Sequence, residues 1–168
     1  MKALLMVVGA ALVFAGCGDK KAEVAKAPEA PANPALAKIV VKDPAPAAIG
    51  VKAAKADLKT GDKAVVEGKV KDFVEGAAVI TLVDLSMKDC KQRGEGCETP
   101  WDYCCEDPKA MTAATATVQA VGDGAAPLPG SLKGVGTIDH LITVVAEGKV
   151  EKDDSGNLVI KASRIYVK

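Results

Sequence analysis

Aromatic residues and histidine are scarce in this sequence of 168 residues. Phe, Trp and Tyr together make up 3% of the chain, and His140 is the single histidine. Proteins that stack single-stranded bases need aromatic side chains on their strands beside a basic groove. The 22 basic and 22 acidic residues give a formal net charge of zero, which argues against general polyanion binding. We therefore expect no nucleic-acid partner.

Catalytic sequence motifs are also absent. The chain contains no nucleophile elbow, no phosphate-binding loop and no HExxH sequence. His140 has only Asp139 as a neighbouring acid and no second histidine to work with, so we expect it to be a solvent-facing loop residue. The sequence predicts a protein without enzymatic activity.

The N-terminus has the features of a secretory signal. Lys2 precedes an apolar run over residues 3–14, which ends in small residues. A run of this length falls short of the roughly 20 residues that a membrane-spanning helix needs. Residues 1–16 are therefore predicted to be a signal peptide that is removed on export.

The cleavage site contains a cysteine. The residues Phe14-Ala15-Gly16-Cys17 resemble the bacterial lipobox, with Phe14 in place of the more usual leucine. The resemblance implies a lipoprotein in which Cys17 becomes N-terminal and acylated, with palmitate as a typical chain. It implies a membrane anchor on the periplasmic side of the cell envelope, with the outer membrane favoured over the inner one.

Ala, Pro and Lys dominate residues 17–59, and large apolar side chains are few there. Such a composition disfavours a buried core and favours extended conformations. We expect a disordered tether from the lipid anchor to a folded domain over residues 60–168. That domain has the usual size of one compact unit.

The domain is expected to be all-β. Strand-forming residues flank two turn-like segments, residues 71–76 and 152–157. The predicted strands are residues 64–70, 77–85, 114–121, 142–150 and 158–167.

The two predicted hairpins resemble each other at a constant offset of 80 residues. Residues 65–70 and 145–150 align, and each hairpin has a glycine within a strand, Gly68 or Gly148. A glycine in a strand marks a bulge or sharp bend of the kind a barrel requires. The pattern predicts a five-stranded, partly open barrel of the OB-fold type, with a short irregular helix within residues 128–140. An immunoglobulin-like sandwich needs more strands.

The last third of the chain is similar to the periplasmic haem chaperones of cytochrome c maturation, which are membrane-anchored OB-folds. Leu132, residues 144–150 with Glu147-Gly148-Lys149, and Ala162-Ser163-Arg164-Ile165 carry the similarity. In that family a histidine after the final strand binds haem covalently. No histidine follows Arg164 here, so the resemblance implies the fold and not haem binding.

The segment over residues 86–111 concentrates the reactive side chains. It contains Cys90, Cys97, Cys104 and Cys105, an even set once Cys17 is assigned to the lipid anchor. In an oxidising compartment this arrangement is typical of disulfides. Cys104 and Cys105 would each pair with Cys90 or Cys97, because adjacent residues in an extended chain point in different directions. The sequence leaves the pairing open.

Two other chemistries are compatible with these thiols. Four thiolates could hold Zn or Cu, although structural zinc sites usually have short C-x₂₋₄-C pairs and the gaps here are six, six and zero. A redox-active pair is less favoured, because there is no C-x-x-C motif. No cofactor is expected unless the metal alternative holds.

Trp101 and Tyr103 lie within the cysteine-rich segment. On an extended stretch they would share one face, as a patch for an envelope protein or glycan or as a lid over disulfides. The sequence therefore favours a lipid-anchored binding or scaffold module of the envelope. The alternative is a thiol-based metal-binding or redox accessory protein of the periplasm.

Overall fold

The computed structural model describes residues 33–168 of the chain. The predicted signal peptide and Cys17 lie outside the described residues. Over residues 33–168, no helix is both long enough and apolar enough to span a membrane.

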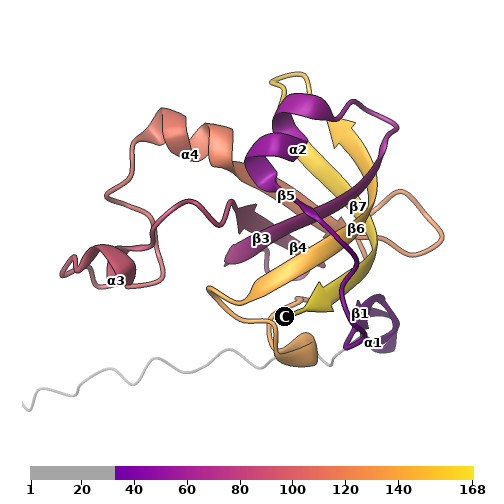
Figure 1. Cartoon of the computed structure of the whole chain (residues 1–168). Helices are drawn as coiled ribbons and strands as arrows, with labels where there is room; N and C mark the ends of the chain where they lie inside the picture. Colours follow the sequence, from indigo (N-terminus) through magenta and orange to yellow (C-terminus); the bar gives the residue numbers. More distant parts are fainter. Residues whose placement is uncertain (1–32) are drawn as a thin grey trace, which may run out of the picture.

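Five strands form a closed barrel (Figure 1). They are β3 (Lys63–Phe73), β4 (Val79–Val83), β5 (Thr115–Ala120), β6 (Thr143–Lys152) and β7 (Leu158–Val167). Neighbouring strands are antiparallel except β5 and β7, which are parallel, and β6 closes the barrel by pairing with both β3 and β7. This connectivity is that of the OB-fold, so the predicted all-β barrel is confirmed.

Both predicted hairpins are present, with one change of boundary. Strand β3 continues to Phe73, so the first reversal starts three residues later than expected and contains Gly76 at φ 75°. In the second reversal, the Asp153 carboxylate accepts hydrogen bonds from the backbone N–H groups of Ser155 and Asn157. The helix before β6 is a single 3₁₀ turn at Val135–Thr137, as short and irregular as its glycines predict.

Alternating side chains of the strands fill the barrel. Along β3, residues with even numbers from Ala64 to Val70 are buried and the residues between them are more exposed, as expected of a strand with one face on a core. The fully buried core side chains include Val66, Val70, Ile80, Leu82, Val118, Val144, Leu158, Ile160 and Ile165.

The two glycines within strands lie where the barrel backbone is most crowded. At Gly148, an added Cβ would lie 2.0 Å from the carbonyl oxygen of Lys161, and the register of β6 against β7 shifts between Glu147 and Gly148. At Gly68, an added Cβ would lie 2.9 Å from the carbonyl oxygen of Val83. The expected bulge is present at Gly148, and the absence of a side chain at both positions lets neighbouring segments approach.

Residues 33–59 are folded, in contrast to the tether predicted through residue 59. They form α1 (Pro34–Ile39), β1 (Val40–Val41), β2 (Ile49–Gly50) and α2 (Val51–Asp57). Strand β1 pairs with β7 and β2 with β3, and Leu36, Val51 and Ala54 are fully buried. The few apolar residues of this segment suffice because the barrel provides the surface against which they pack.

Asp84, directly after β4, connects this N-terminal segment to the barrel. Its carboxylate accepts hydrogen bonds from the backbone N–H of Lys52 at 2.9 Å and from the backbone N–H and hydroxyl of Ser86 at 3.0 and 2.7 Å. Burial alone raises the pKa of this carboxyl, but these hydrogen bonds outweigh it and hold the pKa below its usual value. The ionised form therefore stabilises the fold.

Replacing Asp84 with asparagine is expected to lower the free energy of unfolding at pH 7 by about 1–3 kcal/mol. Because the folded pKa is lowered, the contribution of Asp84 is complete above the unfolded pKa of about 3.9 and is lost as pH falls through the folded value. Urea unfolding at pH 7 and through the range below about pH 4 tests this. The difference between wild type and D84N should shrink at acid pH, and the exposed control D123N should match wild type throughout. A constant difference would contradict the ionic role.

Candidate metal centre

The β4–β5 connection is a long insertion, defined here as the cysteine insertion over residues 84–114. It contains α3 (Cys90–Arg93) and α4 (Pro108–Ala114). In Figure 1, α3 lies to the left, away from the barrel strands. A separate buried cluster of Val83, Met87, Tyr103 and Ala114 fixes the base of the insertion.

Local capping interactions determine how the insertion folds. The Asp89 carboxylate accepts the N–H of Gln92, and the Gln92 side chain accepts the N–H of Asp89, which forms a capping box for α3. Gly94 ends the helix in the left-handed conformation at φ 74°. The backbone N–H of Cys90 also donates to the carbonyl of Asp102 at 2.8 Å. The left-handed Gly94 and the hydrogen bond to Asp102 bring the later part of the insertion back toward Cys90.

The four cysteines of the insertion converge on one point. The Sγ atom of Cys104 lies 3.4 Å from that of Cys90, 3.3 Å from that of Cys97 and 3.8 Å from that of Cys105. Cys97 and Cys105 are separated by 3.7 Å, and all four sulfurs lie within 4.8 Å of one another. Cys90 is buried, Cys97 is half-buried, and Cys104 and Cys105 are exposed.

None of these four cysteines forms a disulfide in the structure. A disulfide brings two sulfurs to about 2.05 Å, well below the observed separations. Each sulfur lies close to several others rather than to one partner, so the predicted pairing does not describe this arrangement. Four sulfurs within 4.8 Å of one another could instead hold a single metal ion.

The hydrogen bonds within the cluster shift the pKa values of its thiols in different directions. Burial alone raises the pKa of Cys90, but hydrogen bonds from the Cys104 and Cys97 thiols and from the backbone N–H groups of Cys104 and Cys105 lower it on balance. The pKa of Cys97 is raised because its thiol hydrogen-bonds to Cys104, Cys90 and Cys105. The pKa is thus lowered at Cys90 and raised at Cys97 and Cys104.

Two ion pairs dock the insertion onto β3. Lys69 Nζ lies 3.4 Å from the carboxylate of Asp89, which is buried, and Lys71 Nζ lies 3.2 Å from that of Asp102. The backbone N–H of Tyr103 lowers the pKa of Asp102; burial opposes this, and Lys71 adds to it. These contacts position the cysteine cluster relative to the barrel.

Trp101 and Tyr103 do not form the shared patch that an extended stretch would give. The backbone turns here, so the Tyr103 ring is buried against Val83 and Met87, whereas Trp101 is 38% exposed. Burial raises the pKa of Tyr103 to about 12, and its hydroxyl has no hydrogen-bond partner among the described residues. Tyr103 is thus a packing residue, and Trp101 alone remains available at the surface.

His140 is half-buried, which corrects the expectation of a solvent-facing residue. Its Nδ1 lies 2.6 Å from the carbonyl oxygen of Lys71. Its ring packs against Phe73 in a T-shaped arrangement and against the tilted ring of Trp101, at centroid distances of 5.1 and 5.2 Å. Trp101 and His140 border a groove of about 440 Å³ that Lys91 and Lys133 also line. The ring thus helps to seat the insertion on the barrel.

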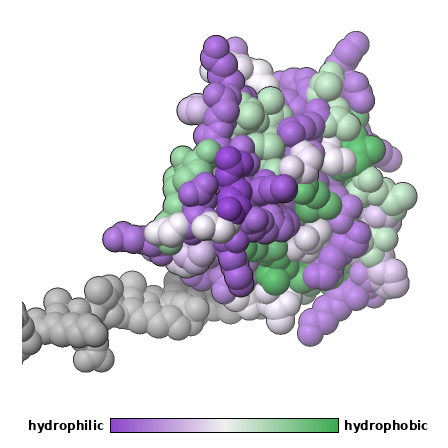
Figure 2. Space-filling view, turned by 60° about the vertical axis from the view of Figure 1, so that its left-hand side comes forward, coloured by the Kyte–Doolittle hydropathy of each residue, from purple (hydrophilic) through white to green (hydrophobic). Residues whose placement is uncertain are grey.

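The face that carries the insertion has no single dominant apolar area. Figure 2 shows mainly hydrophilic side chains there, with hydrophobic ones in separate smaller patches. Over the described residues, the exposed large hydrophobic side chains are Ile49, Val74, Leu85 and Trp101. Small separate patches of this kind are ordinary on protein surfaces.

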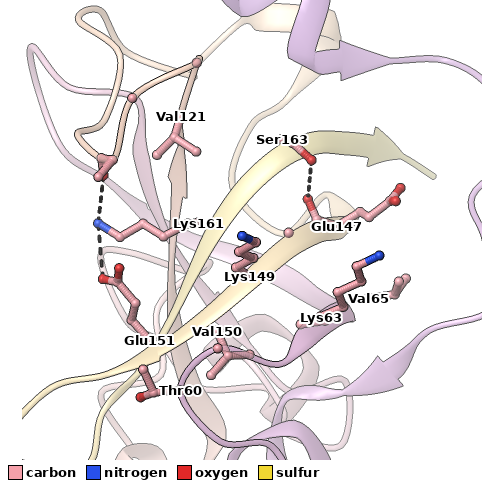
Figure 3. Close-up of a pocket in the computed structure, with 16 residues that line it drawn as sticks. Thr60, Lys63, Val65, Val121, Glu147, Lys149, Val150, Glu151, Lys161 and Ser163 are labelled. Atoms are coloured by element: carbon pink, nitrogen blue, oxygen red, sulfur yellow. Dashed lines mark hydrogen bonds and ion pairs between the residues drawn. The ribbon is translucent and has the colours of Figure 1, made fainter.

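A second groove, of about 760 Å³, lies on the outer side of β3, β6 and β7 and extends to the loop after β5 (Figure 3). Lys63, Lys149 and Lys161 line it, so we name it the lysine groove. The sequence interpretation missed it, because Lys63 is brought beside Lys149 and Lys161 only by the pairing of β3 with β6, which are far apart in the chain. None of the four clustered cysteines lines it.

Fold and cysteine cluster together define an OB-fold barrel with a four-cysteine insertion between β4 and β5. No family model matches the chain, and comparison with curated proteins and with solved structures finds no significant relative.

Proposed function

We propose that this protein is a non-enzymatic metal-binding module of the cell envelope, in which Cys90, Cys97, Cys104 and Cys105 bind one Zn²⁺. The observation that supports the proposal is the spacing of the four sulfurs. Tetrahedral coordination at about 2.3 Å from Zn²⁺ places thiolate sulfurs about 3.8 Å apart. The short separations in the cluster are 3.3–3.8 Å.

The ligand set favours zinc in a structural role. A tetrahedral set of four sulfurs is characteristic of zinc or iron–sulfur sites, and zinc with four protein ligands has no open position for substrate. The ion would join Cys90 at the start of α3 to Cys104 and Cys105, beyond Trp101. It would thereby hold the insertion closed over Asp102 and Trp101, which contact the barrel.

Metal content and thiol state test the proposal directly. The full chain, purified in detergent without reductant, is expected to contain one zinc per chain by elemental analysis and to show the same ion in native mass spectrometry. After denaturation its four insertion cysteines should react as free thiols. Cys97→Ser should lose most of the zinc, whereas the control Cys17→Ser should keep it, because the four sulfurs of the cluster already supply a complete tetrahedral ligand set.

Two disulfides without metal would contradict the zinc proposal. That result would favour the second candidate, a disulfide-stapled binding module that contacts an envelope protein or glycan. The exposed ring of Trp101, at the rim of the groove beside His140, is the observation that favours this candidate. The same mass spectrum separates the two, because each disulfide removes two hydrogens, whereas a bound zinc ion adds its mass less that of the thiol protons it displaces.

Lipid anchoring through Cys17 remains part of the proposal and has its own test. Cys17→Ser removes the thiol that the lipobox-like sequence offers for acylation, so the variant should move from the membrane fraction to the soluble fraction of cells. Because one acyl chain binds membranes only weakly and several bind stably, the change should be nearly complete. Cys97→Ser serves as the matched control and should remain with the membrane. Persistent membrane association of C17S would contradict the lipoprotein prediction.

A further inference from the structure

Three lysines form a row across three neighbouring strands in the lysine groove. Lys63 on β3 is the register partner of Lys149 on β6, and Lys149 is the register partner of Lys161 on β7. Like charges in directly opposed positions destabilise a sheet. The chain has equal numbers of acidic and basic residues, so an excess of lysine does not account for the row. The arrangement is unfavourable for folding and calls for another explanation.

Only Lys161 is compensated by groups near it. Its Nζ donates to the Gln119 side chain at 2.6 Å and to the carbonyl of Ala125 at 3.0 Å, and it lies 3.4 Å from the Glu151 carboxylate. The other acid lining the groove, Glu147, accepts the hydroxyl of Tyr166 at 2.8 Å. Within residues 33–168, no carboxylate forms an ion pair with Lys63 or Lys149.

Small residues form part of the lining of the groove. Gly122, Gly124 and Gly148 line the groove. In Figure 3, Lys149 stands at the centre of the groove, with Lys161 on one side and Lys63 on the other. At Gly148 an added Cβ would meet the backbone of Lys161, so the glycine and the close approach of β6 to β7 form one wall of the groove.

We propose that the lysine groove binds an organic phosphate monoester, with its phosphate between Lys63 and Lys149. A phosphate monoester carries a charge of about −1.5 to −2 at pH 7 and three strong acceptor oxygens, which matches two uncompensated ammonium groups. A carboxylate would neutralise only one of them. The volume of about 760 Å³ leaves room for the organic part of the ligand. This inference is independent of the cysteine cluster.

Calorimetric titration of the full chain in detergent at low ionic strength tests the ligand class. Glucose 6-phosphate serves as the organic monoester, inorganic phosphate as the free anion, and glucose as the uncharged control. We expect binding of glucose 6-phosphate, weaker binding of inorganic phosphate and none of glucose. Equal binding of both phosphates would overturn the claim that the organic part is recognised. If neither phosphate binds, the proposal is overturned.

Variants of the row test the location. Lys63→Gln and Lys149→Gln should each weaken glucose 6-phosphate binding about tenfold or more, the usual loss for one charge-assisted contact. Lys109→Gln, which removes an exposed charge on α4 outside the groove, should leave binding unchanged. Binding that survives in the Lys63→Gln/Lys149→Gln double variant would overturn the assignment.

The melting temperature of the unliganded protein is a second readout, which distinguishes a ligand site from lysines that merely support the fold. Because like charges oppose each other in the row, Lys149→Gln should raise the melting temperature of the unliganded protein while binding is lost. Lys109→Gln should not raise it. A lower melting temperature in Lys149→Gln would show that the lysine supports the fold and would overturn the argument from the unfavourable row.

Discussion

Replacing Gly148 with alanine is expected to unfold the barrel or to lower its free energy of unfolding by more than about 3 kcal/mol. The new Cβ would lie 2.0 Å from the carbonyl oxygen and 2.6 Å from the carbonyl carbon of Lys161, and 2.8 Å from the Cα of Ala162. These are backbone atoms of β7, so no side-chain rotation relieves the clash. Circular dichroism during urea unfolding measures the loss.

Gly124 provides the matched control for this substitution. Nothing lies within 4 Å of a Cβ built there, and its φ is not positive, so Gly124→Ala should change stability by less than about 0.5 kcal/mol. A similarly small effect of Gly148→Ala would mean that β6 and β7 do not approach as closely at the bulge as described. It would also contradict the role of the strand glycines in closing the barrel.

Loss of the proposed metal is expected to release the cysteine insertion while the barrel remains folded. Cys104→Ser removes the sulfur that is closest to two others in the cluster. The ordered structure of small thiolate zinc sites depends on the ion, so Trp101 should leave the His140 ring and become more exposed to water. Trp101 is the single tryptophan of the chain, so a shift of its emission to longer wavelength reports on the insertion alone.

Chelation of the wild-type protein gives the reversible form of this experiment. A strong zinc chelator should produce the same emission shift, and added Zn²⁺ should restore the original spectrum in wild type but not in Cys104→Ser. The far-ultraviolet circular dichroism should keep its β-sheet shape, since the barrel core contains none of the four cysteines. An emission spectrum that is insensitive to chelator would contradict a metal that orders the insertion.

The barrel could be predicted because its strands carry strong local signals. Alternating β-branched residues, a turn over residues 152–157 that contains Asp, Gly and Asn, and strand glycines at an offset of 80 residues all indicate the same architecture. The folded residues 33–59 gave no such signal. Leu36, Val51 and Ala54 are buried only because the completed barrel offers them a surface, and a sparse apolar pattern does not reveal such a surface.

The cysteine cluster and the lysine groove could not be predicted from the spacing of residues along the chain. The gaps between the cysteines disfavoured a metal, but the capping box at Asp89 and the left-handed Gly94 fold the loop back, so that distant cysteines meet. The turn at Trp101 separates it from Tyr103. The lysine row exists only in the register of β3, β6 and β7; Lys149 and Lys161 share a predicted hairpin, but a sequence pattern does not specify the register that brings the distant Lys63 beside them.

The pairing of β3 with β6 also has a kinetic consequence. Lys69 pairs with Thr143, so closing the barrel closes a loop of about 70 residues, a topology that folds slowly compared with local hairpins. The whole cysteine insertion lies inside this loop. A metal joining Cys90 to Cys104 before closure would shorten the loop by about 14 residues. This would lower the entropic free-energy cost of closing the loop by only about 0.2 kcal/mol. We expect the ion to set the shape of the insertion while leaving the folding rate of the barrel nearly unchanged.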